Sequence, residues 1–123
     1  MPGREQLEKA MAYDRDGAEA EAIPHYEQAI AAGLSSEQLE KAMLGLGSSL
    51  RNVDRVEESV AVLEDACRRF PHHRALPIFL AFSLWSSGRR GEALALLARR
   101  LGEGSGYENA IREYADEIER SKG

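Results

Sequence analysis

The 123-residue sequence repeats itself, and the period of the repeat restricts the folds open to it. Three landmarks recur in a fixed order: a small residue, a turn-forming residue and a second small residue. They are Ala10, Gly17 and Ala22, then Gly47, Asp54 and Ser59, then Ala81, Gly88 and Ala93. Each landmark recurs 37 residues later in the second unit, and 34 residues after that in the third. Periods of this length are typical of arrays in which one supersecondary unit stacks on the next.

Each unit is predicted to be a pair of helices. Apolar residues recur at the three-to-four spacing of an amphipathic helix at Val56, Val60, Leu63, Cys67 and Phe70. The chain contains no Thr, and Ala, Leu, Glu and Arg, which are all good helix formers, dominate its composition. Gly17 and Gly88 can adopt the left-handed backbone angles that end a helix. Ser35 with Gln38 reads as a capping box that opens the next helix.

The end of the chain predicts one further helix. Three glycines interrupt the sequence at 102, 104 and 106, and a first-helix pattern then returns, with Ala115 lying 34 residues after Ala81. We therefore expect a single domain over 1–123 with seven helices: units at about 3–36, 40–73 and 74–106, and a capping helix at about 107–121. Pro77 should fall in the first turn of its helix, whereas Pro24 should kink or shorten the helix that contains it.

The landmarks resemble those of the tetratricopeptide repeat family, whose 34-residue unit is a helix–turn–helix. The resemblance is best in the middle unit, which has a large residue at Met43, Leu46-Gly47 after it, and Phe70-Pro71 at its end. The outer units depart from the pattern; the departures are Gln6, Lys9, Arg100 and Ser105. The resemblance implies an all-α fold, an α–α superhelix, and a protein that binds other polypeptides without catalysis.

The resemblance also implies where a ligand would bind, because in this family the first helix of each unit lines a concave groove. The candidate groove residues are Leu44, Arg51 and Asn52 of the second unit and Ile78, Phe79, Phe82 and Trp85 of the third. Some relatives hold chaperone carboxylates through a clamp of Lys, Arg and Asn. Here the corresponding positions include Leu7, Met11, Ser48 and Phe79, so the clamp is essentially absent and an apolar or mixed segment is the expected ligand.

The third unit's first helix is apolar nearly all round, so a second face of it needs burial. Phe79, Phe82 and Trp85 recur every three residues on that face. Two interpretations stay open: the aromatic residues form an exposed groove patch, or they are covered, either by the capping helix or as part of the central core. An exposed patch would favour a scaffold that binds a protein or peptide. The alternative is a self-assembling protein that forms a homodimer through the same residues.

Other functions find little support in the sequence. The net charge of −5 argues against nucleic-acid binding, because a protein that binds nucleic acid needs a concentrated positive surface. The Arg pairs are explained by their places at the ends of helices, where the helix dipole favours positive charge. We expect no enzyme, no cofactor and no metal site: Cys67 lies on an apolar stripe without a base, and adjacent His72 and His73 do not readily converge on one ion. No apolar run suggests a membrane segment or a leader, so the expected setting is cytoplasmic.

Overall fold

The computed structural model describes residues 1–121, which form seven α-helices and no strand. The helices are α1 (Arg4–Arg15), α2 (Glu19–Ala32), α3 (Ser36–Asn52), α4 (Val56–Arg69), α5 (Leu76–Ser86), α6 (Arg90–Gly102) and α7 (Glu108–Arg120). The all-helical prediction and the expected seven helices are confirmed.

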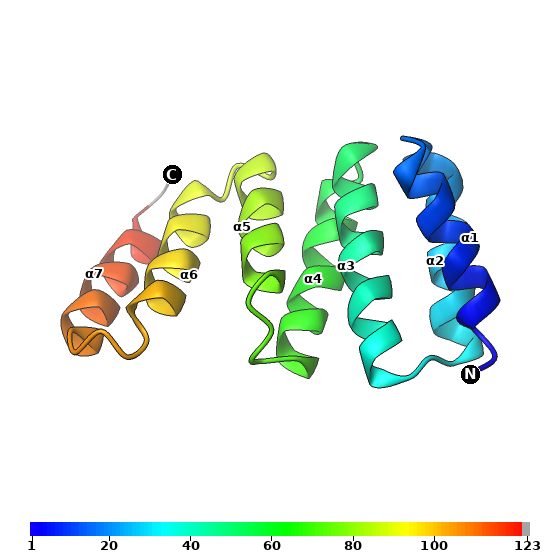
Figure 1. Cartoon of the computed structure of the whole chain (residues 1–123). Coiled ribbons are helices and arrows are strands. Elements are labelled where there is room, and N and C mark those ends of the chain that lie inside the picture. The colour runs from blue at the N-terminus through cyan, green and yellow to red at the C-terminus, as the bar shows by residue number, and fades with distance from the viewer. Residues whose placement is uncertain (122–123) are drawn as a thin grey trace.

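The helices stand side by side in chain order and make an elongated array, with α1 and α2 at one end and α7 at the other (Figure 1). Each helix packs on the next one, and the first helices also pack on each other, α1 on α3 and α3 on α5. The buried side chains form two clusters, one under α1 to α3 and one under α3 to α6. This is the expected α–α superhelix.

The same turn closes each of the three helix pairs. Gly17, Asp54 and Gly88 have φ angles of 76°, 71° and 83°, in the left-handed region where a residue without a Cβ is favoured and Asp is tolerated. The next residue then donates its N–H to a carbonyl five residues back, which satisfies a group that the helix end leaves free. These bonds join Ala18 to Tyr13 (2.8 Å), Arg55 to Leu50 (2.8 Å) and Arg89 to Leu84 (2.9 Å).

Small residues let the helices of the middle unit approach closely, as the repeat pattern predicts. A Cβ placed on Gly47 of α3 would lie 2.5 Å from Cγ of Leu63 on α4. Beside this contact the buried Ser59 donates its hydroxyl to the Gly47 carbonyl at 2.6 Å. Its oxygen also lies 2.7 Å from Oγ of Ser83 on α5, so a hydrogen bond joins α4 to α5 inside the core.

The predicted helix starts are present. Ser35 and Gln38 form a reciprocal capping box at α3, with bonds of 3.1 and 3.2 Å. Pro77 lies in the first turn of α5, and Nδ1 of His73 accepts the N–H groups of Ala75 and Leu76 there, each at 3.2 Å. These contacts satisfy backbone donors that the first helical turn leaves without partners.

Pro24 has less effect than expected. Helix α2 continues through it and has 14 residues, as many as α4, so the expected shortening is wrong. A proline removes the N–H that would bond the carbonyl four residues earlier, here that of Ala20. Since Ala20 is exposed, water can satisfy its carbonyl.

Among the helices of residues 1–121, α7 packs on α6 alone. Gly91 and Gly102 of α6 allow the close approach, because a Cβ there would meet the Ile118 carbonyl at 3.0 Å and the Ile111 side chain at 2.7 Å. Arg99 of α6 forms ion pairs with Asp116, at 2.7 Å, and with Glu119. Within the described chain no Cα atom of α7 lies within 8 Å of a Cα atom of α5, and Phe82 and Trp85 of α5 are 48% and 55% exposed. The interpretation in which the capping helix covers the aromatic residues of α5 is therefore wrong.

Candidate functional site

Helix α5 buries one face and exposes a second apolar one. Its core face holds Leu76, Leu80, Ala81 and Leu84. The opposite side, which we call the α5 patch, consists of Ile78, Phe79, Phe82 and Trp85. Ile78 is 44% exposed, Phe82 48% and Trp85 55%, while Phe79 is half-buried. Contiguous exposed apolar surface of this kind is typical of an interaction site.

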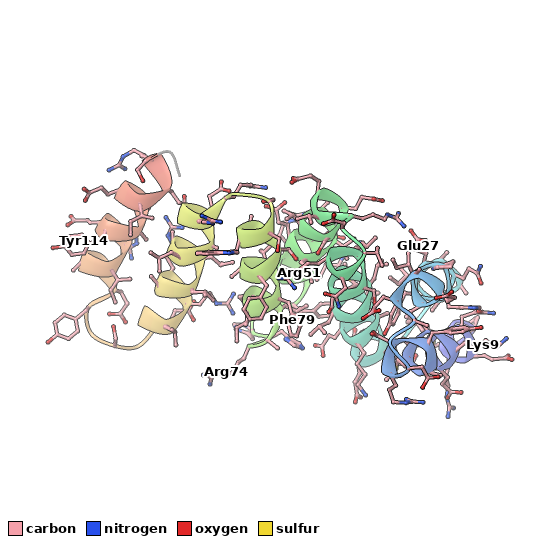
Figure 2. The ribbon with its side chains drawn as sticks, turned by 90° about the horizontal axis from the view of Figure 1, so that it is seen from above. Lys9, Glu27, Arg51, Arg74, Phe79 and Tyr114 are labelled. Carbon is pink, nitrogen blue, oxygen red and sulfur yellow. The ribbon has the colours of Figure 1, made fainter. Side chains whose placement is uncertain are left out.

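The α5 patch is ordered by contacts among its own rings and with two arginines. Phe79 and Phe82 meet edge to face, with centroids 6.0 Å apart at an interplanar angle of 83°. The guanidinium of Arg51 on α3 lies 5.9 Å from the Phe82 centroid, and its Nε donates to Oγ of Ser86 at 3.0 Å. Figure 2 shows Arg51 and Phe79 near the middle of the array.

The second arginine, Arg90, begins α6 and lies with its guanidinium 4.6 Å from the Trp85 centroid. Among residues 1–121, neither Arg51 nor Arg90 has a carboxylate oxygen within 4.0 Å, whereas Arg55 and Arg99 do. Stacking on an aromatic ring holds a guanidinium in place and leaves its N–H groups free to donate. The α5 patch thus carries two positioned positive charges at its edges.

Two of the sequence-predicted groove residues lie differently from the others. Leu44 of α3 is half-buried and packs on the second core cluster, on which Phe79 of the α5 patch also packs. Asn52 is exposed, and its Nδ2 lies 3.5 Å from Oε1 of Glu19, so its side chain points to the start of α2. Leu7, placed in the groove by sequence, is buried in the core instead. The structure brings Arg51 to the α5 patch, places Leu44 and Phe79 on the same core cluster, and leaves Asn52 outside this group.

Sequence reasoning missed Arg90 and two exposed leucines of α6, Leu94 and Leu101. The family resemblance places the groove on the first helix of each unit, so side chains of the second helices were not among the candidates. A signal was present in the spacing, because Leu94 and Leu101 lie seven residues apart and therefore on one side of a helix.

The remaining reactive side chains have structural surroundings. Cys67 is half-buried at the edge of the core, and burial raises the pKa of its thiol, which makes it a poor nucleophile. Tyr26 is buried and donates to Oδ2 of Asp14 at 2.7 Å; burial and this bond raise its pKa. Within the described part of the chain, no three His, Cys, Asp or Glu side chains gather closely enough to hold a metal ion. Among residues 1–121, no helix is long and apolar enough to cross a membrane.

The comparisons with known proteins agree with the helical repeats. A family model described as tetratrico peptide repeat matches residues 3–118, which is nearly the whole chain. No curated protein matches the chain closely enough to serve as a relative. Repeats of this family generally form non-catalytic scaffolds for protein–protein interaction. With the left-handed turn repeated at 17, 54 and 88 and the family model spanning the helices, the chain belongs to the tetratricopeptide repeat family.

Proposed function

We propose that the protein is a non-catalytic scaffold that binds a segment of another polypeptide over the α5 patch, with Leu44 and Arg51 of α3 beside it. The observation that carries the proposal is the exposure of Ile78, Phe82 and Trp85 on a well-packed helix whose other face is core. Aromatic residues and Arg are also the residue types that most often dominate binding energy at protein interfaces.

The kind of segment follows from the chemistry of the surface. An apolar side chain that covers two rings of the α5 patch would be buried against preformed edge-to-face aromatic packing, at little cost in ordering. Carboxylates on the segment could pair with Arg51 and Arg90, which lack acidic partners among residues 1–121. An apolar segment with acidic residues beside it therefore fits better than a basic one.

A second copy of the chain could occupy the same patch, which gives the homodimer as the alternative. Analytical ultracentrifugation separates the two: a scaffold for a different polypeptide sediments as a monomer at micromolar concentration. A concentration-dependent dimer that the Phe82→Ala/Trp85→Ala double variant converts to monomer supports self-assembly instead.

The proposal is tested by affinity capture from native lysate with the wild-type chain and the F82A/W85A variant. We expect proteins that the wild type retains and the variant loses, and then direct binding of the recovered protein to the purified wild type. The control is Tyr13→Gln, which changes an exposed aromatic residue of α1 at the other end of the array.

Folding of the variants is checked by circular dichroism before binding is compared. Both altered side chains of the double variant are about half exposed, so its helical content should stay close to that of the wild type. Normal capture by a folded F82A/W85A variant contradicts the proposal. Loss of helical structure in that variant would show that Phe82 and Trp85 serve the core, which also contradicts it.

A further inference from the structure

The exposed apolar surface does not end at α5. The first helix of each unit packs on the first helix of the next unit, α1 on α3 and α3 on α5. The series stops at α5, because within residues 1–121 helix α7 packs on α6 only. One long edge of α6 is therefore left open, and it carries Leu94, 56% exposed, and Leu101, 81% exposed. No other helix of residues 1–121 exposes two leucines to this extent.

This open edge of α6 lies on the same side of the array as the α5 patch. Arg90 stacks on Trp85, and Leu94 follows Arg90 by one helical turn, with Leu101 two turns further along the same edge. The opposite edge of α6 carries Arg99, which pairs with Asp116 of α7. The open edge and the ion-paired edge thus lie on opposite sides of the contact between α6 and α7.

Helix α7 continues the apolar surface. Tyr107, just before α7, and Tyr114 are exposed and seven residues apart, which places them on one side of the helix. They flank Ile111, which packs on Gly102 of α6, and they lie away from the edge that holds Asp116. Three neighbouring helices therefore present one apolar edge each; we call the three edges together the C-terminal face. Its members are Ile78, Phe82, Trp85, Leu94, Leu101, Tyr107 and Tyr114.

The dimensions of the C-terminal face indicate the shape of its occupant. Each edge spans seven residues, which is about 10.5 Å along a helix axis. Three helices packed at 8–10 Å span roughly 16–20 Å across. An α-helix, about 10–12 Å in diameter and about 20 Å long for 13 residues, covers such an area. An extended strand takes up only about 5 Å in width and would leave half of each edge exposed.

The charges around the C-terminal face indicate the composition of the occupant. Arg51 lies at the α3 side of the face, and Arg90 lies between α5 and α6. Each guanidinium stacks on a ring and has no carboxylate partner in the described chain. Cations held in this way favour acidic residues opposite them. The carboxylates of α7 near the other margin, such as Glu113 and Glu117, disfavour acidic residues there.

We propose that the C-terminal face is the full binding surface and that its occupant is an amphipathic α-helix of a partner protein. The helix lies across α5, α6 and α7, inserts apolar residues between Trp85, Leu94 and Tyr114, and directs acidic residues toward Arg51 and Arg90. This inference rests on the proposed function and adds to it the second helix of the third unit, the capping helix, and the conformation of the ligand.

The test is a selection from a display library of random 16-residue peptides against the full chain. Enriched peptides are synthesised and their affinities measured by fluorescence anisotropy for the wild type and three variants: F82A/W85A, Leu94→Gln/Leu101→Gln, and Y13Q as the control. Gln has nearly the helix propensity of Leu, and both leucines are exposed, so L94Q/L101Q should fold. If the double variant loses helicity, the single variant Leu101→Gln takes its place in the comparison of peptide affinities.

We expect enriched peptides with apolar residues at the three-to-four spacing of a helix and with Asp or Glu, which gain helicity when bound. L94Q/L101Q should weaken them at least about tenfold, since burying one Leu side chain is worth about 1.5–3 kcal/mol and 1.4 kcal/mol is tenfold. Y13Q should not weaken them. A Pro placed in the middle of the peptide should abolish binding.

The outcomes separate the two proposals. Peptides that need Phe82 and Trp85, but tolerate L94Q/L101Q or a central Pro, overturn the helical occupant and leave the proposed function standing. A selection with no enriched peptide, or with peptides that bind F82A/W85A normally, overturns both.

Discussion

The guanidinium of Arg90 lies 4.6 Å from the centroid of the Trp85 ring, which joins the first residue of α6 to the exposed edge of α5. This contact fixes the only tryptophan of the chain in a defined position on the C-terminal face, where α5 meets α6. The two residues lie on either side of the turn between the two helices of the third unit.

Arg90→Gln should free the Trp85 ring. We expect stronger quenching of Trp85 emission by acrylamide, and a fall of about 0.5–1 kcal/mol in the free energy of unfolding, as for an exposed cation–π pair. Urea titration followed by circular dichroism measures the second quantity. Quenching equal to that of the wild type would mean that the stack does not persist in solution.

Gly47→Ala should destabilise the array through the contact with Leu63. The added methyl group would lie 2.5 Å from Cγ of Leu63, and overpacking of this kind costs about 1–3 kcal/mol. Because the clash needs the Leu63 side chain, the G47A/L63A double variant should lose less stability than the two single variants together. Urea unfolding of all four chains measures the coupling, and strictly additive losses argue against the close approach.

The two buried serines should differ in their contributions. Ser59 has one hydroxyl proton, which it directs to the Gly47 carbonyl, so Ser83 donates to Ser59. Ser59→Ala leaves the buried Ser83 donor without a partner and should cost about 1–3 kcal/mol. Ser83→Ala removes a donor and leaves only an unused lone pair, so its cost should be smaller. Thermal unfolding ranks the variants; the reverse order would contradict the assigned direction of the bond.

Acidification should loosen the start of α7. Hydrogen bonds from its own backbone N–H and from that of Gly104, at 2.9 Å, lower the pKa of the exposed Glu108 carboxyl. A lowered folded-state pKa means that the ionised group stabilises the fold above its ordinary pKa and that this stabilisation is lost as the pH falls through the folded-state value. Glu108→Gln should therefore show a smaller drop in melting temperature between pH 7 and pH 3. Glu113→Gln, on the same helix, is the control and should keep the full drop.

Much of the fold could be predicted because its turns require particular residues. Positions 17, 54 and 88 need a left-handed backbone, and two glycines and an aspartate there set the period of the array. The capping box at Ser35 and the small residue at Gly47 are equally local requirements. Each of them can be read from a few neighbouring residues.

The candidate site could be predicted only in part, because it depends on how helices sit relative to one another. The α5 patch is visible as a helix with two apolar faces. Whether α7 covers it depends on the contacts of α7 with α6, which involve Gly91, Gly102 and Arg99. The repeat pattern does not specify these three residues, so it does not predict the contacts. The exposure of Leu94 and the position of Arg90 follow from that packing. The direction of Asn52 toward Glu19 likewise depends on the neighbouring unit.

The most direct test of the central claim follows Trp85 emission while a peptide from the selection is added to the wild-type chain. Trp85 is the only tryptophan and is 55% exposed, so a ligand that covers the C-terminal face must remove its ring from water. We predict a saturable shift of the emission maximum to shorter wavelength, with the midpoint at the dissociation constant measured by anisotropy. Emission that stays unchanged while the peptide saturates the protein would place the binding site elsewhere and contradict the account.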